Sequence, residues 1–112
     1  MFKVAIIGSS AAGSYEQFSD RCKYFLKNKI KDGILIYATE ETPFIKKFST
    51  QYRIDVQYFY TDWKSFGKNA LKERNKMLLS DCNGIIWFDD GLKDTNMIKY
   101  MAEKIGTPVK SA

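Results

Sequence analysis

The residues best suited to chemistry follow two apolar runs. The first run, 3–7, ends in Gly8, and a loop of small residues and hydroxyl groups continues to Ser14. Such a loop at the start of a helix offers backbone N–H groups, and the helix dipole also favours an anion, so the pattern indicates a phosphate site. The alternative is steric, because small residues suit any tight strand-to-helix turn and neither GxGxxG nor Walker A spacing is present. The candidate ligand-binding residues are Gly8, Ser9, Ser10, Gly13 and Ser14.

The second run, 84–88, ends in Asp89, Asp90 and Gly91, and Thr95 follows where a helix is expected to begin. The carboxylates can bind a ribose or hold Mg²⁺ through oxygen ligands, and Thr95 adds a hydroxyl. A simple turn is the alternative, since Asp-Gly is common in turns. No metal site or cofactor is otherwise predicted, because no metal-ligand spacing is present.

Arg74 is placed by helical periodicity in the middle of an apolar stripe. A guanidinium rarely enters a core without a partner. It can form a salt bridge to one of the aspartates after 84–88, or it can bind phosphate or carboxylate in bidentate fashion. Asn75, at the edge of the stripe, would share either role. The apolar members of the stripe are Ala70, Leu71, Met77 and Leu78.

Two acidic residues and a tryptophan leave further alternatives open. Glu40 and Glu41 precede an expected helix, where carboxylates favour the dipole, although they can also reach a site as acid–base groups. Trp63 is either a buried anchor or a platform on which a base stacks.

Composition excludes several kinds of enzyme. The chain has no histidine, which removes Ser-His-Asp and Cys-His nucleophilic schemes and histidine metal sites. Cys22 and Cys82 are isolated and are predicted to be buried thiols. The net charge of +5 comes from scattered lysines, which favours a solvated surface. Nucleic acid is therefore not the expected partner, although Lys64, Lys68, Lys72 and Lys76 would line one helix face and can track a phosphate backbone.

The elements that position these residues alternate between strand and helix. The 112 residues suffice for a single domain, 1–112, and no apolar run is long enough to span a membrane or resembles a signal peptide, so a cytoplasmic location is expected. A helix is capped by Ser14, another by Thr42 with Pro43 at its first position, a third covers about 66–80, and a fourth is capped by Asp94 or Thr95. The expected strands are 3–7, 34–38, 54–60, 84–88 and 107–109.

This alternation predicts an α/β fold: a Rossmann-like three-layer sandwich with a five-stranded parallel sheet and four helices. The first, second and fourth strands are apolar throughout and belong in the middle of the sheet. The third alternates and the fifth contains a proline, which gives the order 3-2-1-4-5. Ligands in such sheets bind outside the carboxyl ends of the strands, where the order reverses. The predicted site is therefore made by 8–14 and 88–95.

Short blocks of a recognisable order occupy the second half of the chain: Thr61-Asp62-Trp63, Gly67-Lys68, Arg74-Asn75-Lys76-Met77, Cys82-Asn83-Gly84-Ile85-Ile86, Asp90-Gly91 with Thr95, and Gly106-Thr107-Pro108-Val109. As a set they resemble the SLOG superfamily of Rossmann-like nucleotide-binding domains, near its small YspA-like branch. The family's glycine-rich loop after the second strand is degenerate here and is replaced by Thr39 to Phe44. The resemblance implies that the loops after the first, second and fourth strands enclose a nucleotide-derived ligand, with Thr39 in the second loop.

Three functions follow as hypotheses. The first is binding, by sensing or sequestration, of a nucleotide-derived molecule such as an ADP-ribose or cyclic nucleotide signal. For this hypothesis the resemblance implies a homo-oligomer, and compact stand-alone proteins of this kind include ones carried by phages and mobile elements. The second is a nucleotide N-glycosidic hydrolase that uses Glu40 or Glu41 as acid–base and Asp89 or Asp90 to stabilise an oxocarbenium-like centre. The third is a non-enzymatic, oligomeric protein-interaction module.

Overall fold

The computed structural model describes residues 1–112, apart from the side chain of Ile30. Its centre is a five-stranded sheet in the order β3-β2-β1-β4-β5, with every neighbouring pair parallel. The predicted fold class and strand order are confirmed. The strands are β1 (Phe2–Ile7), β2 (Ile34–Ala38), β3 (Asp55–Tyr58), β4 (Gly84–Trp87) and β5 (Val109–Ser111).

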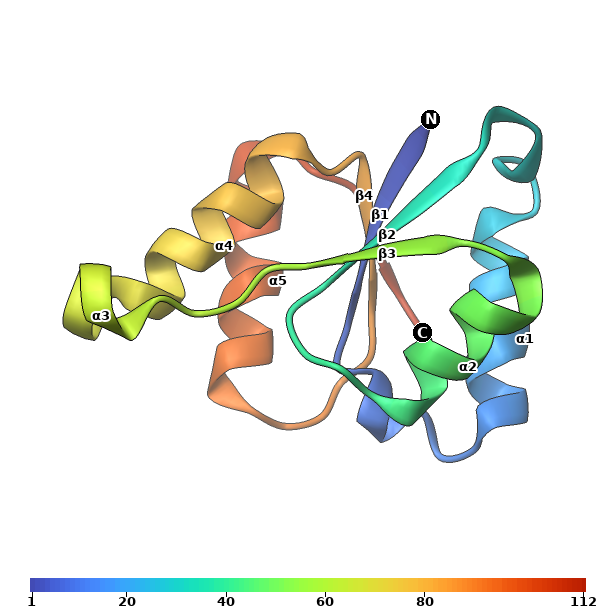
Figure 1. Cartoon of the computed structure of the whole chain (residues 1–112), viewed down its shortest axis with the longest axis horizontal. Helices are drawn as coiled ribbons and strands as arrows, with labels where there is room; N and C mark the ends of the chain where they lie inside the picture. The colour runs from blue at the N-terminus through green and yellow to red at the C-terminus, as the bar shows by residue number, and fades with distance from the viewer.

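The main helices cover the two faces of the sheet in pairs (Figure 1). On one face lie α1 (Tyr15–Leu26) and α2 (Pro43–Tyr52), and on the other lie α4 (Ala70–Asp81) and α5 (Lys93–Ile105). No helix in the described part of the chain is long and apolar enough to cross a membrane. The short elements are α3 (Trp63–Phe66) and three 3-10 helices, η1 (Ser9–Ala12), η2 (Ile30–Asp32) and η3 (Gly67–Asn69).

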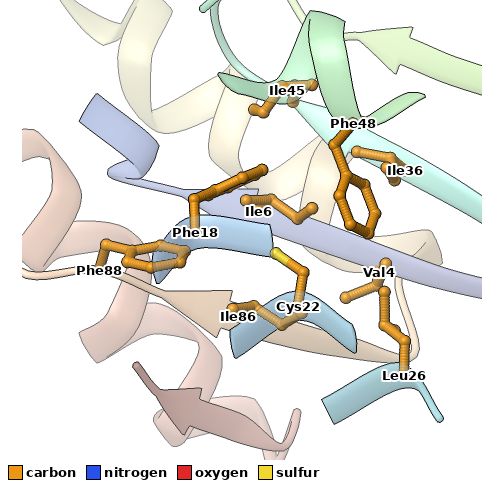
Figure 2. Close-up of a cluster of buried hydrophobic side chains, with 11 residues drawn as sticks. Val4, Ile6, Phe18, Cys22, Leu26, Ile36, Ile45, Phe48, Ile86 and Phe88 are labelled. Carbon is orange, nitrogen blue, oxygen red and sulfur yellow. The ribbon is translucent and has the colours of Figure 1, made fainter. Parts of the chain in front are cut away.

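The first face has an apolar core made by α1, α2 and the inward side of β1, β2 and β4. Phe18, Cys22 and Leu26 project from successive turns of α1 toward the strands (Figure 2). This spacing is the helical periodicity expected of a stripe that faces a sheet. Burial raises the pKa of the Cys22 thiol to about 12. The buried members are Val4, Ile6, Phe18, Cys22, Leu26, Ile36, Ala38, Ile45, Phe48, Ile86 and Phe88.

The second face is less regular than the sequence predicts. The helix expected over 66–80 is interrupted, because Gly67 has φ +52° and ψ −129°, outside the helical region, and α4 begins only at Ala70. The predicted lysine row is therefore divided among α3, η3 and α4. The prediction of Met77 in the core is wrong, since its side chain is 59% exposed. The buried side of α4 centres on Arg74, Asn75 and Leu78, and Met77 lies about 100° around the axis from Leu78.

Other sequence predictions need smaller corrections. Leu92, not Asp94 or Thr95, is the N-cap of α5. Two apolar residues of α5, Met97 and Ile105, are exposed, Ile105 because it lies in the last turn before Gly106. Trp63 is 56% exposed and is no buried anchor. Cys82 is only half-buried, because it lies just past the end of α4. Strand β5 runs over 109–111, after the predicted 107–109, and β3 is shorter than 54–60.

Candidate functional site

The sheet order reverses between β1 and β4, and their carboxyl ends approach closely at Gly8. Its φ is +73°, and a Cβ at this position would lie 2.1 Å from the carbonyl oxygen of Phe88. Only glycine fits such a backbone approach. Gly8 is therefore required by the packing of the two loops, whether or not a phosphate binds there.

The hydroxyls of the loop after β1 are used largely within the protein. Ser9 is 2% exposed, and its Oγ lies 2.8 Å from Oγ1 of Thr42, the N-cap residue of α2. Ser14 caps α1 as predicted, because its Oγ accepts a hydrogen bond from the Gln17 N–H at 3.2 Å. Ser10 and Gly13 are exposed. Of the loop hydroxyls predicted to contact a ligand, only that of Ser10 stands open on the surface.

The aspartates after β4 organise their own loop. Asp89 Oδ1 accepts a hydrogen bond from the Gly91 N–H at 2.9 Å. Asp90 Oδ1 accepts one from the Leu92 N–H at 2.9 Å, and its Oδ2 accepts one from the buried Thr95 hydroxyl at 2.8 Å. Among the described residues, no group of three or more His, Cys, Asp or Glu is placed to hold a metal ion. Asp90 and Thr95 thus meet as predicted, in an arrangement that stabilises the start of α5.

Arg74 is buried, as its place in the stripe predicts, and it lies in a polar cluster between α4, α5 and the segment after β3. Its Nη2 donates to Asp94 Oδ2 at 3.0 Å and to Asn75 Oδ1 at 2.9 Å. Its Nε donates to the same Asn75 oxygen at 3.2 Å, and its Nη1 donates to Thr61 Oγ1 at 3.1 Å. Of the two alternatives for Arg74, the structure shows the salt bridge. The acidic partner of Arg74 is Asp94, not Asp89 or Asp90.

This cluster leaves hydrogen-bonding capacity unused. Asn75 Nδ2 and Asp94 Oδ1 are buried and have no hydrogen-bond partner among the described atoms. A guanidinium has five N–H donors, so the four hydrogen bonds of Arg74 leave one N–H of Nη1 without an acceptor among them. Unpaired polar atoms of this kind cost stability.

The acidic residues of the loop after β2 lie at the surface. Glu40 and Glu41 are exposed and Thr39 is half-buried. The contact that Glu41 makes is with Tyr60, whose hydroxyl donates to Oε1 at 3.5 Å. The pKa of Tyr58 is raised, first by burial and then by the charge of Glu41. The structure therefore brings Glu41 toward Tyr58, the last residue of β3, and Tyr60 just beyond it, and none of the hydrogen bonds of the described residues joins it to the loop of Asp89 and Asp90.

A hollow of about 380 Å³ opens beside the point where the strand order reverses. It is bounded by η1, the end of β4 and the first turns of α1. The candidate residues named from the sequence do not line it, although it touches both predicted segments, 8–14 and 88–95. Sequence reasoning missed the polar wall, whose only signal is the spacing of Gln17 and Arg21 one helical turn apart. The lining residues are Ala11, Ala12, Gln17, Asp20, Arg21, Phe88 and Ala112.

Comparison of the sequence with protein-family models and with curated proteins finds no match. The resemblance to the SLOG superfamily thus remains a prediction from short blocks of sequence.

Proposed function

We propose that the protein binds a small nucleotide-derived molecule, such as an ADP-ribose or cyclic nucleotide signal, in the hollow between η1, α1 and the end of β4. The observation that carries this proposal is the position of the hollow, at the reversal of strand order. In open parallel sheets this is where ligands bind. The volume of about 380 Å³ lies at the small end of the range for small-molecule sites, which favours one nucleotide unit.

The polar wall of the hollow suits such a ligand. The Arg21 guanidinium can contact phosphate in bidentate fashion, and Asp20 and Gln17 can accept or donate hydrogen bonds to sugar hydroxyls and a base edge. Binding without catalysis is favoured, because the Asp90 carboxylate is occupied by its own loop and the exposed Glu40 and Glu41 do not line this hollow.

The experiment is a thermal-shift screen against cyclic nucleotides, ADP-ribose, AMP and NAD, followed by calorimetric titration. A ligand at 100 times its Kd adds about 2.7 kcal/mol to the free energy of unfolding. Arg21→Ala should weaken binding by about tenfold or more, since a hydrogen bond to a charged group contributes about 1.5–3 kcal/mol. The matched control, Lys27→Ala, removes an equal charge just beyond α1 and should leave the affinity unchanged.

One observation favours a second candidate, the non-enzymatic interaction module. Arg74, the buried cation offered for a ligand anion, is already paired with Asp94. Two results would contradict the binding proposal and support this module. One is the absence of a thermal shift with every nucleotide tested, and the other is an equal loss of affinity in Arg21→Ala and Lys27→Ala. Sedimentation velocity over a range of concentrations would then show whether the chain associates with itself.

A further inference from the structure

A second hollow of about 380 Å³ lies at the opposite, amino edge of the sheet. It opens between the C-terminal ends of α1 and α2, where β2 and β3 begin. Its wall is apolar, and Leu26 and Phe48 are each only 2% exposed. Ile34 and Ile54 extend this wall, so the hollow offers a dry surface to an apolar group.

The mouth of this hollow carries an excess of positive charge. Lys23 and Arg53 line it together with one carboxylate, that of Asp55. Lys23 lies 3.8 Å from Asp20 in an exposed pair, and its Nζ is 5.9 Å from the centre of the Tyr52 ring. Arg53 takes part in none of the ion pairs found among the described side chains. An apolar wall under two cations is complementary to a molecule with an apolar tail and an anionic head.

Arg53 also has a backbone conformation that an arginine rarely adopts. It is the C-cap residue of α2, with φ 54° and ψ 47°, and its N–H donates to the Ser49 carbonyl. It is the one non-glycine residue with a positive φ in the described chain. Helices that end in this way usually have glycine or asparagine at the position. The backbone conformation therefore gives no reason for an arginine at this position, and this arginine lines the hollow.

We propose that this hollow binds a small organic acid with an apolar tail, of the class of medium-chain aliphatic carboxylates. The tail would lie against Leu26 and Phe48, and the carboxylate would face Arg53 and Lys23. This site is separate from the one under Proposed function and does not depend on it.

The test is a titration of ¹⁵N-labelled protein with octanoate and, separately, with 1-octanol, followed by amide chemical shifts. Octanoate should cause saturable shifts at Leu26, Ile34 and Ile54, and octanol should bind at least tenfold more weakly. Arg53→Gly should weaken octanoate binding at least tenfold and leave octanol unchanged. Because glycine suits this backbone, the variant should melt no lower than the wild type, so lost binding cannot be attributed to unfolding. Lys68→Ala, which removes a charge from η3, is the control and should bind octanoate normally.

Four results would overturn the proposal. The first is equal affinity for the acid and the alcohol, which would leave no role for the cations. The second is octanoate binding that survives Arg53→Gly. The third is an absence of saturable shifts at the hollow. The fourth is concentration-dependent dimerisation that protects these same residues, in which case the surface is an interface between copies of the chain.

Discussion

The two helical layers that flank the sheet differ in how they are held. In the layer of α1 and α2, Phe18 packs on Phe44, Phe48 and Phe88 with ring centroids 5.5–5.8 Å apart. In the layer of α4 and α5, the buried groups include Arg74 and Asn75, and Arg74 also pairs with Asp94, whose side chain is 38% exposed. Apolar burial has no preferred direction, whereas a polar cluster is stable only when its hydrogen bonds are made. The Arg74–Asp94 pair therefore adds a directional contact between α4 and α5 to the apolar packing of the second layer.

The largest effect expected from truncation of a side chain lies in the first layer. Phe18→Ala should lower the free energy of unfolding by about 4 kcal/mol, because it removes a fully buried ring and leaves a cavity among three others. Urea denaturation followed by circular dichroism measures the change. Tyr24→Ala, at a position 60% exposed on the same helix, should cost far less. A loss for Phe18→Ala below about 2 kcal/mol would mean that the aromatic cluster is not the centre of this layer.

The next effect lies in the second layer. Arg74→Ala should cost about 2 kcal/mol, because the buried Asn75 side-chain oxygen and the partly exposed Asp94 carboxylate lose their donors. The double variant Arg74→Met with Asp94→Leu should recover at least about 1 kcal/mol of that loss, since it also removes the carboxylate left unpaired. Chemical denaturation of both variants compares them. If the double variant is no more stable than Arg74→Ala, the stability lost in Arg74→Ala comes from packing and not from unpaired polar groups. The second layer would then be held in the same way as the first.

A smaller effect should appear as pH dependence at Tyr37 and Asp81. The Tyr37 hydroxyl donates to Asp81 Oδ2 at 2.6 Å, and this bond, followed by Lys3, lowers the pKa of Asp81. The ionised Asp81 carboxylate therefore stabilises the folded state at pH values above the pKa that this carboxyl has in the unfolded chain. This stabilisation is lost as pH falls through the lower pKa of Asp81 in the folded state. Burial, and then Asp81, raises the pKa of Tyr37 to about 12 from 10.0. The contribution of the neutral Tyr37 hydroxyl to the free energy of unfolding is therefore fully present below pH 10.0 and is lost as pH rises toward about 12.

Tyr37→Phe should make the melting temperature less dependent on pH both in the acid range, where Asp81 titrates, and in the alkaline range, where Tyr37 titrates. These two ranges are the two limbs of a plot of melting temperature against pH. The Cys22 thiol, whose pKa is also raised to about 12 by burial, remains in wild type and variant, so the difference between them isolates the tyrosine. Tyr60→Phe, at an exposed position, should leave both limbs unchanged. Parallel curves for wild type and Tyr37→Phe would show that the hydrogen bond to Asp81 has no linkage to folding.

The first layer could be predicted almost completely from the sequence. Its helices have standard caps at Ser14 and Thr42, and the buried positions of α1 recur at helical spacing. The strand order also followed from composition, because apolar strands belong in the middle of a parallel sheet. In this half of the molecule the local signals, namely the caps and the helical spacing, favour the same structure as the tertiary packing. A sequence pattern predicts structure well where these two agree.

The second layer and the site could be predicted only in part. The burial of Arg74 was visible in the periodicity, but its partner was not, because Asp89, Asp90 and Asp94 are close in sequence and only the loop geometry separates them. That loop turns the first two carboxylates toward its own N–H groups and leaves Asp94 to face α4. The position of Arg21 at a hollow could not be predicted, since it depends on how η1 and the end of β4 pack beside α1.

The smallest expected effect concerns Met77, where the apolar pattern and the fold disagree. Met77→Lys should change the free energy of unfolding by no more than about 0.5 kcal/mol, because the side chain is 59% exposed. Leu78→Lys, one residue further and fully buried, should prevent stable folding, since it places an unpaired charge between α4 and the sheet. Equal losses for the two variants would mean that α4 is rotated from the position described, and Arg74 would then face away from Asp94. The pair of variants therefore tests the orientation on which the whole polar cluster depends.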